Sequence, residues 1–212
     1  MSTSTAQLAL ATVALAIGIA ATWAQARAKR NLHYVTKPLA TTLILVLAAT
    51  RAIESPVSGW WIVAGLALSL GGDVLLMLPD RFVPGLGSFL LAQVCYIVAF
   101  TIAAPILGPL WTLVPSLLLL VVLVLTVLPK TGALRWPVLG YALVITAMAW
   151  RATTRYVALA EPNALLSLLG AWLFCASDLS LAWNRFVRQA AWLPIFCLSS
   201  YYLAQVLIAL SI

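Results

Sequence analysis

The sequence predicts an all-α integral membrane protein, a bundle of about eight transmembrane helices forming one domain over residues 1–212. Of its 212 residues, 64% are hydrophobic and 8% are charged, and the mean hydropathy is +1.09. Soluble domains carry roughly 25% charged residues, so this chain has too few charges to solvate a 22.7 kDa globule. Apolar runs also recur along the whole chain at near-regular intervals. Together these observations exclude a soluble enzyme, a disordered chain and a nucleic-acid-binding protein.

Eight apolar runs bounded by charged residues, Pro or Gly are predicted to be the helices, because a membrane-spanning helix needs about 20 mostly apolar residues. In chain order they cover residues 8–25, 38–53, 59–78, 87–104, 110–128, 136–153, 163–183 and 191–210. The second run is the shortest, at 16 residues starting from Pro38. Seven or nine spans are the alternatives. The first run lacks a preceding basic segment, so we expect it to be retained rather than cleaved as a signal peptide.

Basic residues follow the odd-numbered runs and thereby predict the orientation. In chain order these loops carry Arg27, Lys29, Arg30 and Lys37, then Arg81, then Lys130 and Arg135, then Arg185 and Arg188. The other loops carry Arg51, Arg151 and Arg155. The positive-inside rule places the first group in the cytoplasm and both termini outside it. The net charge of +7 is therefore interpreted as topology. Short length and alanine-rich helices without a retention signal favour a bacterial inner membrane.

The cysteines and the histidine predict no metal and no cofactor. Cys95, Cys175 and Cys197 fall inside apolar helices, where a small buried hydrophobe is the expected role, and we infer no disulfide. His33 is the sole histidine and is placed in the first cytoplasmic loop, so an ordinary nitrogen and sulfur metal site cannot form around it.

An internal similarity divides the chain into halves, 1–106 and 107–212. The segment from Asp73 to Val83 resembles the segment from Asp178 to Val187, with DVLL and DRFV in the first copy and DLSL and NRFV in the second. Four spans separate the copies, which predicts two four-helix repeats in the same orientation. Chance similarity between Leu- and Ala-rich segments is the alternative.

The repeat places two carboxylates at one depth in the membrane. Asp73 precedes Pro79 by six residues and Asp178 precedes Asn184 by six, so each lies about 9 Å from the cytoplasmic end at about 1.5 Å per residue. An intramembrane carboxylate costs a few kcal/mol or more and normally faces the interior at a functional site. Small neighbours, Gly71 and Gly72 in the first copy, allow close helix approach. The alternative role for each Asp is a structural hydrogen bond or an ion pair.

Other polar residues could complete a cavity around the two aspartates. The candidate binding residues are Lys37, Ser69, Gln93, Tyr96, Ser177, Asn184, Arg185, Tyr201, Tyr202 and Gln205. Lys37 could contact a lipid phosphate or serve topology alone, and Tyr202 could be an interfacial anchor. Arg51 and Arg151 lie toward the outer side, where we expect them to extend to the lipid headgroups.

The segments GGDVLLMLP, FVPGLGSFLLAQVCYIVAF, LFCASDLSLAWNRF and KPL resemble the YhhN-like lysoplasmalogenase family of polytopic membrane hydrolases. The resemblance covers nearly the whole chain, and its most specific parts are the two Asp-bearing segments. Gln93 stands where a histidine is expected in many relatives. The resemblance implies cleavage of the vinyl-ether bond of lysoplasmalogens to a fatty aldehyde and a glycerophospho-base. It also implies that Asp73 and Asp178 are the catalytic residues.

The chemistry of two carboxyls is compatible with that implication. Hydrolysis of a vinyl ether needs a proton on the terminal vinyl carbon and a water on the oxocarbenium carbon, so one carboxyl can act as acid and the other as base. We favour Asp178 as the base because Ser177 and Asn184 offer polar groups nearby. The lysolipid would enter from the bilayer, with its chain between helices and its phosphate near Lys37, Arg81 or Arg185.

Two other classes use the same residues. A proton- or ion-coupled transporter of small or lipid-like solutes would use the aspartates as a relay, but corresponding spans lack paired Gly or Pro breaks. A lipid-scaffolding membrane protein would leave the carboxylates without a purpose. The headgroup and chain preference and the oligomeric state are left open by the sequence.

Overall fold

A computed structural model describes residues 4–102, 104–106 and 108–212, and in this part of the chain eight helices are long and apolar enough to cross a membrane. They are α1 (Thr5–Ala26), α2 (Arg30–Ala52), α3 (Pro56–Met77), α4 (Phe82–Ile102), α5 (Leu113–Thr126), α6 (Arg135–Leu159), α7 (Pro162–Ala182) and α8 (Trp192–Leu210). Short helical turns extend three of them, η1 (Leu110–Thr112) and η2 (Leu128–Lys130) around α5, η3 (Gly132–Leu134) before α6 and η4 (Trp183–Val187) after α7. The predicted all-α membrane fold is confirmed. Residue 103 of the fourth predicted span and residue 107 at the predicted boundary between halves lie outside the described residues.

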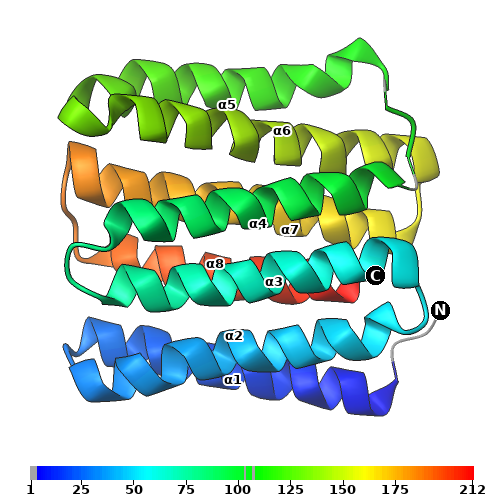
Figure 1. Ribbon diagram of the computed structural model, residues 1–212, viewed down its shortest axis with the longest axis horizontal. Coiled ribbons are helices and arrows are strands. Elements are labelled where there is room, and N and C mark those ends of the chain that lie inside the picture. The colour runs from blue at the N-terminus through cyan, green and yellow to red at the C-terminus, as the bar shows by residue number, and fades with distance from the viewer. Residues whose placement is uncertain (1–3, 103, 107) are drawn as a thin grey trace.

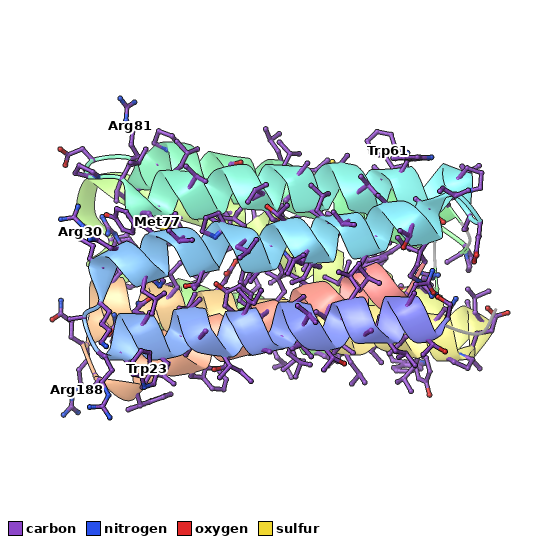
Figure 2. The ribbon with its side chains drawn as sticks, turned by 90° about the horizontal axis from the view of Figure 1, so that it is seen from below. Trp23, Arg30, Trp61, Met77, Arg81 and Arg188 are labelled. Atoms are coloured by element: carbon purple, nitrogen blue, oxygen red, sulfur yellow. The ribbon has the colours of Figure 1, made fainter. Side chains whose placement is uncertain are left out.

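The helices run roughly parallel or antiparallel to one another, and both ends of the chain lie at the same end of the bundle (Figure 1). The loops after α1, α3, α5 and α7 lie at the other end, which we call the basic end, where Arg30, Arg81 and Arg188 project in Figure 2. Helix α8 packs against α1, α2 and α7 and so lies inside the bundle, whereas α5 packs mainly on α6 at the edge. The termini therefore lie opposite the basic end, as the loop charges predict.

The second helix begins earlier than predicted. Pro38 was taken as its start, but α2 begins at Arg30 and contains Pro38 in its interior. Proline removes one backbone donor from a helix, yet it is tolerated in membrane helices where neighbouring groups pair with the freed carbonyl. His33 and Lys37 are consequently on a helix rather than in a loop.

Two glycines let α3 approach α4 closely. A Cβ on Gly65 would lie 2.4 Å from the ring of Tyr96, and a Cβ on Gly72 would lie 2.6 Å from the ring of Phe89. Both rings belong to an aromatic cluster with Phe174 and Tyr201, whose neighbouring ring centroids are 5.8–6.3 Å apart in edge-to-face geometry. The rings of this cluster come from α4, α7 and α8, and α3 packs against two of them through its glycines.

The expectation that Arg51 and Arg151 extend to lipid headgroups was wrong. Arg51 is 3% exposed and donates to the side chain of Gln7 and to the backbone oxygen of Ile212. Arg151 is 4% exposed and donates to the Thr101 hydroxyl and to the carbonyls of Pro105 and Ile106. Both guanidinium groups donate to backbone carbonyls at or just beyond helix ends, where carbonyls have no partner within the helix. The spacing of residues in the sequence does not reveal such long-range pairs.

Candidate functional site

Asp73 lies on α3 four residues before the end of the helix, and its side chain is 1% exposed. The ammonium of Lys37 lies 3.2 Å from its Oδ1, and the hydroxyls of Thr41 and Tyr201 donate to its Oδ2 at 2.6 and 2.8 Å. Lys37 and Thr41 are four residues apart on α2 and therefore share one helix face. One cation and two hydroxyl donors thus compensate the charge of this carboxylate.

Asp178 lies on α7, also four residues before the end of the α-helix, but its surroundings differ. The hydroxyl of Tyr141 on α6 donates to its Oδ2, and Nε2 of Gln93 on α4 lies 3.4 Å from the same oxygen. Gln93 also donates to the Tyr141 hydroxyl at 2.6 Å. Among the described residues, the ion pair of Lys37 with Asp73 has no counterpart at Asp178.

One cavity, with a volume of about 370 Å³, is lined by both aspartates. We call it the polar cavity, because His33, Lys37 and Asn184 also line it. His33 Nδ1 is 3.1 Å from the carbonyl of Ala21, which holds the imidazole between α1 and α2. His33 and Asn184 lie near the basic ends of α2 and α7, so the cavity is located toward that end of the bundle.

The other predicted binding residues divide into two groups. Tyr201 and Ser177 line the polar cavity, although the Ser177 hydroxyl donates to the carbonyl of Cys197 rather than to Asp178. The Asn184 side-chain oxygen accepts from the backbone of Ala190 at the cavity wall. The π-helical turn η4 carries Arg185, whose guanidinium lies over the ring of Phe82 with Cζ 3.7 Å from the centroid.

A second group forms a buried network that does not line the polar cavity. The Tyr96 hydroxyl donates to Oε1 of Gln205 at 2.9 Å and lies 3.3 Å from the Ser69 hydroxyl. These three residues are 0% exposed and join α3, α4 and α8. Tyr202 is buried against Gly18 of α1, so it is not an interfacial anchor. This network supports the helices that hold Asp73 rather than the cavity itself.

Two residues that contact the aspartates, Thr41 and Tyr141, are not among the candidates predicted from the sequence. Thr41 lies one helical turn after Lys37, but a helix that starts at Pro38, as predicted, does not place the two on one helix face. Tyr141 lies inside an apolar span, as Tyr96 does, and the same reasoning would have selected it. His33 lines the cavity together with Lys37, because the two residues are four apart on α2 and share one helix face.

The fold and the site define a class, namely polytopic membrane proteins with two carboxyls, on two membrane-spanning helices, that line one cavity. The chain belongs to the YhhN family, whose family model matches residues 32–212. This match includes both aspartates and every side chain found in contact with them.

Several curated proteins are similar to the chain. It is 34% identical over 155 residues to lysoplasmalogenase TMEM86B of Sus scrofa, covering 69% of this chain and 61% of that protein. It is 34% identical over 178 residues to lysoplasmalogenase TMEM86B of Homo sapiens, covering 79% and 71%. It is 33% identical over 189 residues to the lysoplasmalogenase of Mycobacterium tuberculosis, covering 83% and 70%. The chain thus spans about three fifths to seven tenths of these relatives. No solved structure matches it.

Proposed function

We propose that this protein is a membrane-embedded hydrolase that cleaves the vinyl-ether bond of lysoplasmalogens, using Asp178 as its acid and Asp73 as its base. The observation that carries the proposal is that two carboxyls from α3 and α7 line one cavity but differ in charge compensation. The relatives named lysoplasmalogenase support the same substrate class. The reaction needs no group beyond water and these side chains.

The surroundings of the carboxyls favour Asp178 as the acid and Asp73 as the base, the reverse of the role that we inferred from sequence. The Lys37 ammonium lies 3.2 Å from Asp73 and compensates a negative charge there, as a base requires. Asp178 is hydrogen-bonded by the neutral Tyr141 and Gln93 side chains and has no cationic partner among the described residues, so we assign it the proton that the acid must carry. The Ser177 hydroxyl, expected to solvate an Asp178 anion, donates to the Cys197 carbonyl instead, and no hydrogen bond joins Asn184 to Asp178 among the described residues.

In the proposed reaction, Asp178 gives its proton to the vinyl carbon remote from the oxygen, which leaves an oxocarbenium ion at the other vinyl carbon. Asp73 takes a proton from water as the water oxygen bonds to that carbon, and a hemiacetal forms. The bond from the hemiacetal carbon to the glycerol oxygen then breaks, and Asp73 protonates the departing oxygen. The hemiacetal hydroxyl returns a proton to Asp178, so an aldehyde and an alcohol leave and both carboxyls are restored. This division of labour parallels that of the paired carboxyls of glycosidases.

The test is release of fatty aldehyde from a lysoplasmenyl-ethanolamine by detergent-purified protein, beside Asp73→Asn and Asp178→Asn. Each substitution should lower the rate by about 10²–10⁴-fold, the usual contribution of a positioned acid or base. Asp80→Asn is the matched control, because Asp80 is an exposed carboxylate at the basic end. Folding of each variant is verified by its thermal unfolding midpoint.

Absence of aldehyde from folded wild-type protein, with both ethanolamine and choline headgroups, would overturn the proposal. Proton-coupled solute flux in proteoliposomes, lost in both Asp variants, would then identify the transporter class instead.

For the cellular setting we propose a bacterial inner membrane. The basic loops favour an orientation with the basic end in the cytoplasm.

A further inference from the structure

A second, smaller pocket of about 60 Å³ adjoins the polar cavity and is almost entirely apolar. Side chains of α4, α5, α6 and α7 form its walls, among them Leu86, Leu119, Ala142 and Ile145. Asp178 lines both this apolar pocket and the polar cavity, whereas Asp73 lines only the polar cavity. The carboxyl of Asp178 is therefore at the junction of an apolar space and a polar one.

The wall of the apolar pocket that faces the lipid is made by α5, the least buried helix. Within α5 Ser116 is the sole buried residue, and Leu117, Leu118 and Leu125 are more than half exposed. Helix α5 packs mainly against α6, while α4 packs against α3 and α6. Leu119 of α5 and Leu86 of α4 therefore face one another across the pocket without a packed α4–α5 interface behind them.

The basic end of the apolar pocket is covered by aromatic rings. Phe82 and Phe186 meet edge to face with centroids 6.1 Å apart, and both line the pocket. The guanidinium of Arg185 lies over Phe82 on this side, within the range of a cation–π contact. A hydrocarbon chain would have to pass these rings and the charged group to enter from water. Entry from the bilayer between α4 and α5 avoids both.

We propose that the apolar pocket holds the first carbons of the substrate's aliphatic chain, which enters from the bilayer between α4 and α5. This inference rests on the proposed function and deepens it. The polar cavity then holds the glycerol and phosphate part of the lysolipid. Ala142 and Leu119, which line the apolar pocket, determine which chains are accepted.

The arrangement matches the order of atoms in a vinyl ether. Reading from the chain, the carbon to be protonated comes first, the carbon attacked by water second and the glycerol oxygen third. Asp178, at the junction, lies on the chain side, and Asp73, in the polar cavity, lies on the glycerol side. The acid and base assigned above are therefore on the sides of the bond where the reaction needs them.

The pocket is too small for a whole chain. A volume of about 60 Å³ has room for only a few methylene-sized groups. The rest of a long chain therefore extends between α4 and α5 into the lipid. We therefore expect the protein to discriminate between substrates by branching and bulk at the first carbons of the chain more than by total chain length.

The test compares Ala142→Phe with Leu143→Phe, its neighbour on α6 that is 49% exposed. Substrates are a lysoplasmenyl-ethanolamine with a 16-carbon chain and a vinyl-ether analogue with a two-carbon vinyl group and no further chain. Ala142→Phe should lower kcat/KM for the long-chain substrate by more than 10-fold relative to the chainless analogue, while Leu143→Phe keeps the wild-type ratio. An unchanged ratio in a folded Ala142→Phe protein would overturn the inference.

A binding measurement separates this inference from the proposed function. The probe is a 1-O-alkyl lysophospholipid, whose saturated ether bond is not cleaved, in bilayer nanodiscs. Ala142→Phe should weaken its binding more than 10-fold and Leu143→Phe should not, whether or not the wild type releases aldehyde. Equal binding to both variants would count against the chain site, even if hydrolysis is observed.

A pocket-enlarging variant decides the matter if Ala142→Phe does not fold. Leu119→Ala opens the α5 wall and should raise kcat/KM several-fold for a chain with a methyl branch next to the vinyl group, relative to the straight chain. Leu118→Ala, on the lipid-facing side of α5, is its control. No difference between these two variants in the branched-to-straight ratio would also overturn the inference.

Discussion

The ammonium of Lys37 lies 3.2 Å from the carboxylate of Asp73, in an ion pair whose side chains are 10% and 1% exposed. Both residues lie on membrane-spanning helices, α2 and α3. Asp178, by contrast, is bonded to a phenol and an amide. This difference underlies the separate roles that we propose for two carboxyls that the sequence presents as equivalents, and the consequences are open to measurement.

Lys37→Met should destabilise the protein, because it leaves the Asp73 carboxylate buried without its cation. Breaking one side of a buried ion pair typically costs about 3–5 kcal/mol. Adding Asp73→Asn to Lys37→Met should recover part of this loss, since the amide is neutral and still accepts from Thr41 and Tyr201. Unfolding in detergent of the two single variants and the double variant measures the coupling. Additive effects would show that the pair is not energetically linked.

Tyr141→Phe should lower kcat by about 5-fold with little change in KM, because one neutral hydrogen bond to Asp178 is worth about 1 kcal/mol. The ring remains, so packing against α7 is retained. Tyr156→Phe, on the same helix and not in contact with either aspartate, is the matched control. Steady-state kinetics of aldehyde release provide the measurement. If both variants kept wild-type kcat, Tyr141 would have no part in orienting the acid.

Gly65→Ala should destabilise the α3–α4 interface by about 1–3 kcal/mol, the usual cost of overpacking. The added Cβ would lie 2.4 Å from the Tyr96 ring, which is itself fully buried. Gly140→Ala on α6 is the control, since a Cβ there meets nothing within 4 Å. Thermal unfolding midpoints of the two variants should move apart, with Gly65→Ala lower. A Gly65→Ala midpoint equal to that of wild type would show that Tyr96 shifts without penalty.

The proposed orientation predicts which end is labelled from outside the cell. Arg81→Cys places a thiol at the basic end and Trp61→Cys places one near the opposite end, where Figure 2 shows both side chains at the surface. In a background lacking the three native cysteines, a membrane-impermeant maleimide should label position 61 in intact cells and position 81 only after permeabilisation. The reverse pattern would invert the topology.

The helices and the two aspartates could be predicted from sequence because both depend on local patterns. Length and hydropathy select the spans, and a carboxylate in an apolar run is conspicuous. The start of α2 could not be predicted, because Pro38 is a common helix boundary and its tolerance inside α2 depends on neighbouring helices. Without the first turns of α2, Lys37 is placed in a loop and its position one helical turn before Thr41 cannot be recognised. The repeat stays a prediction.

Partners across the bundle were not predictable for a different reason. Tyr141 reaches Asp178 from 37 residues away, and Tyr201 reaches Asp73 from 128 residues away. Such contacts depend on which helices are neighbours, which composition does not encode. The buried Arg51 and Arg151 illustrate the same limit, since their acceptors are mostly backbone carbonyls of distant segments.

The position of Asp178 in the wall shared by two spaces also bears on how products depart. In the proposed reaction the bond is broken where the polar cavity and the apolar pocket meet, so each fragment is released into the space that matches its polarity. The glycerophospho-base can diffuse out through the polar cavity at the basic end, and the aldehyde can return to the bilayer past α5. In this proposal the two fragments leave by different routes, so neither has to wait for the other to depart.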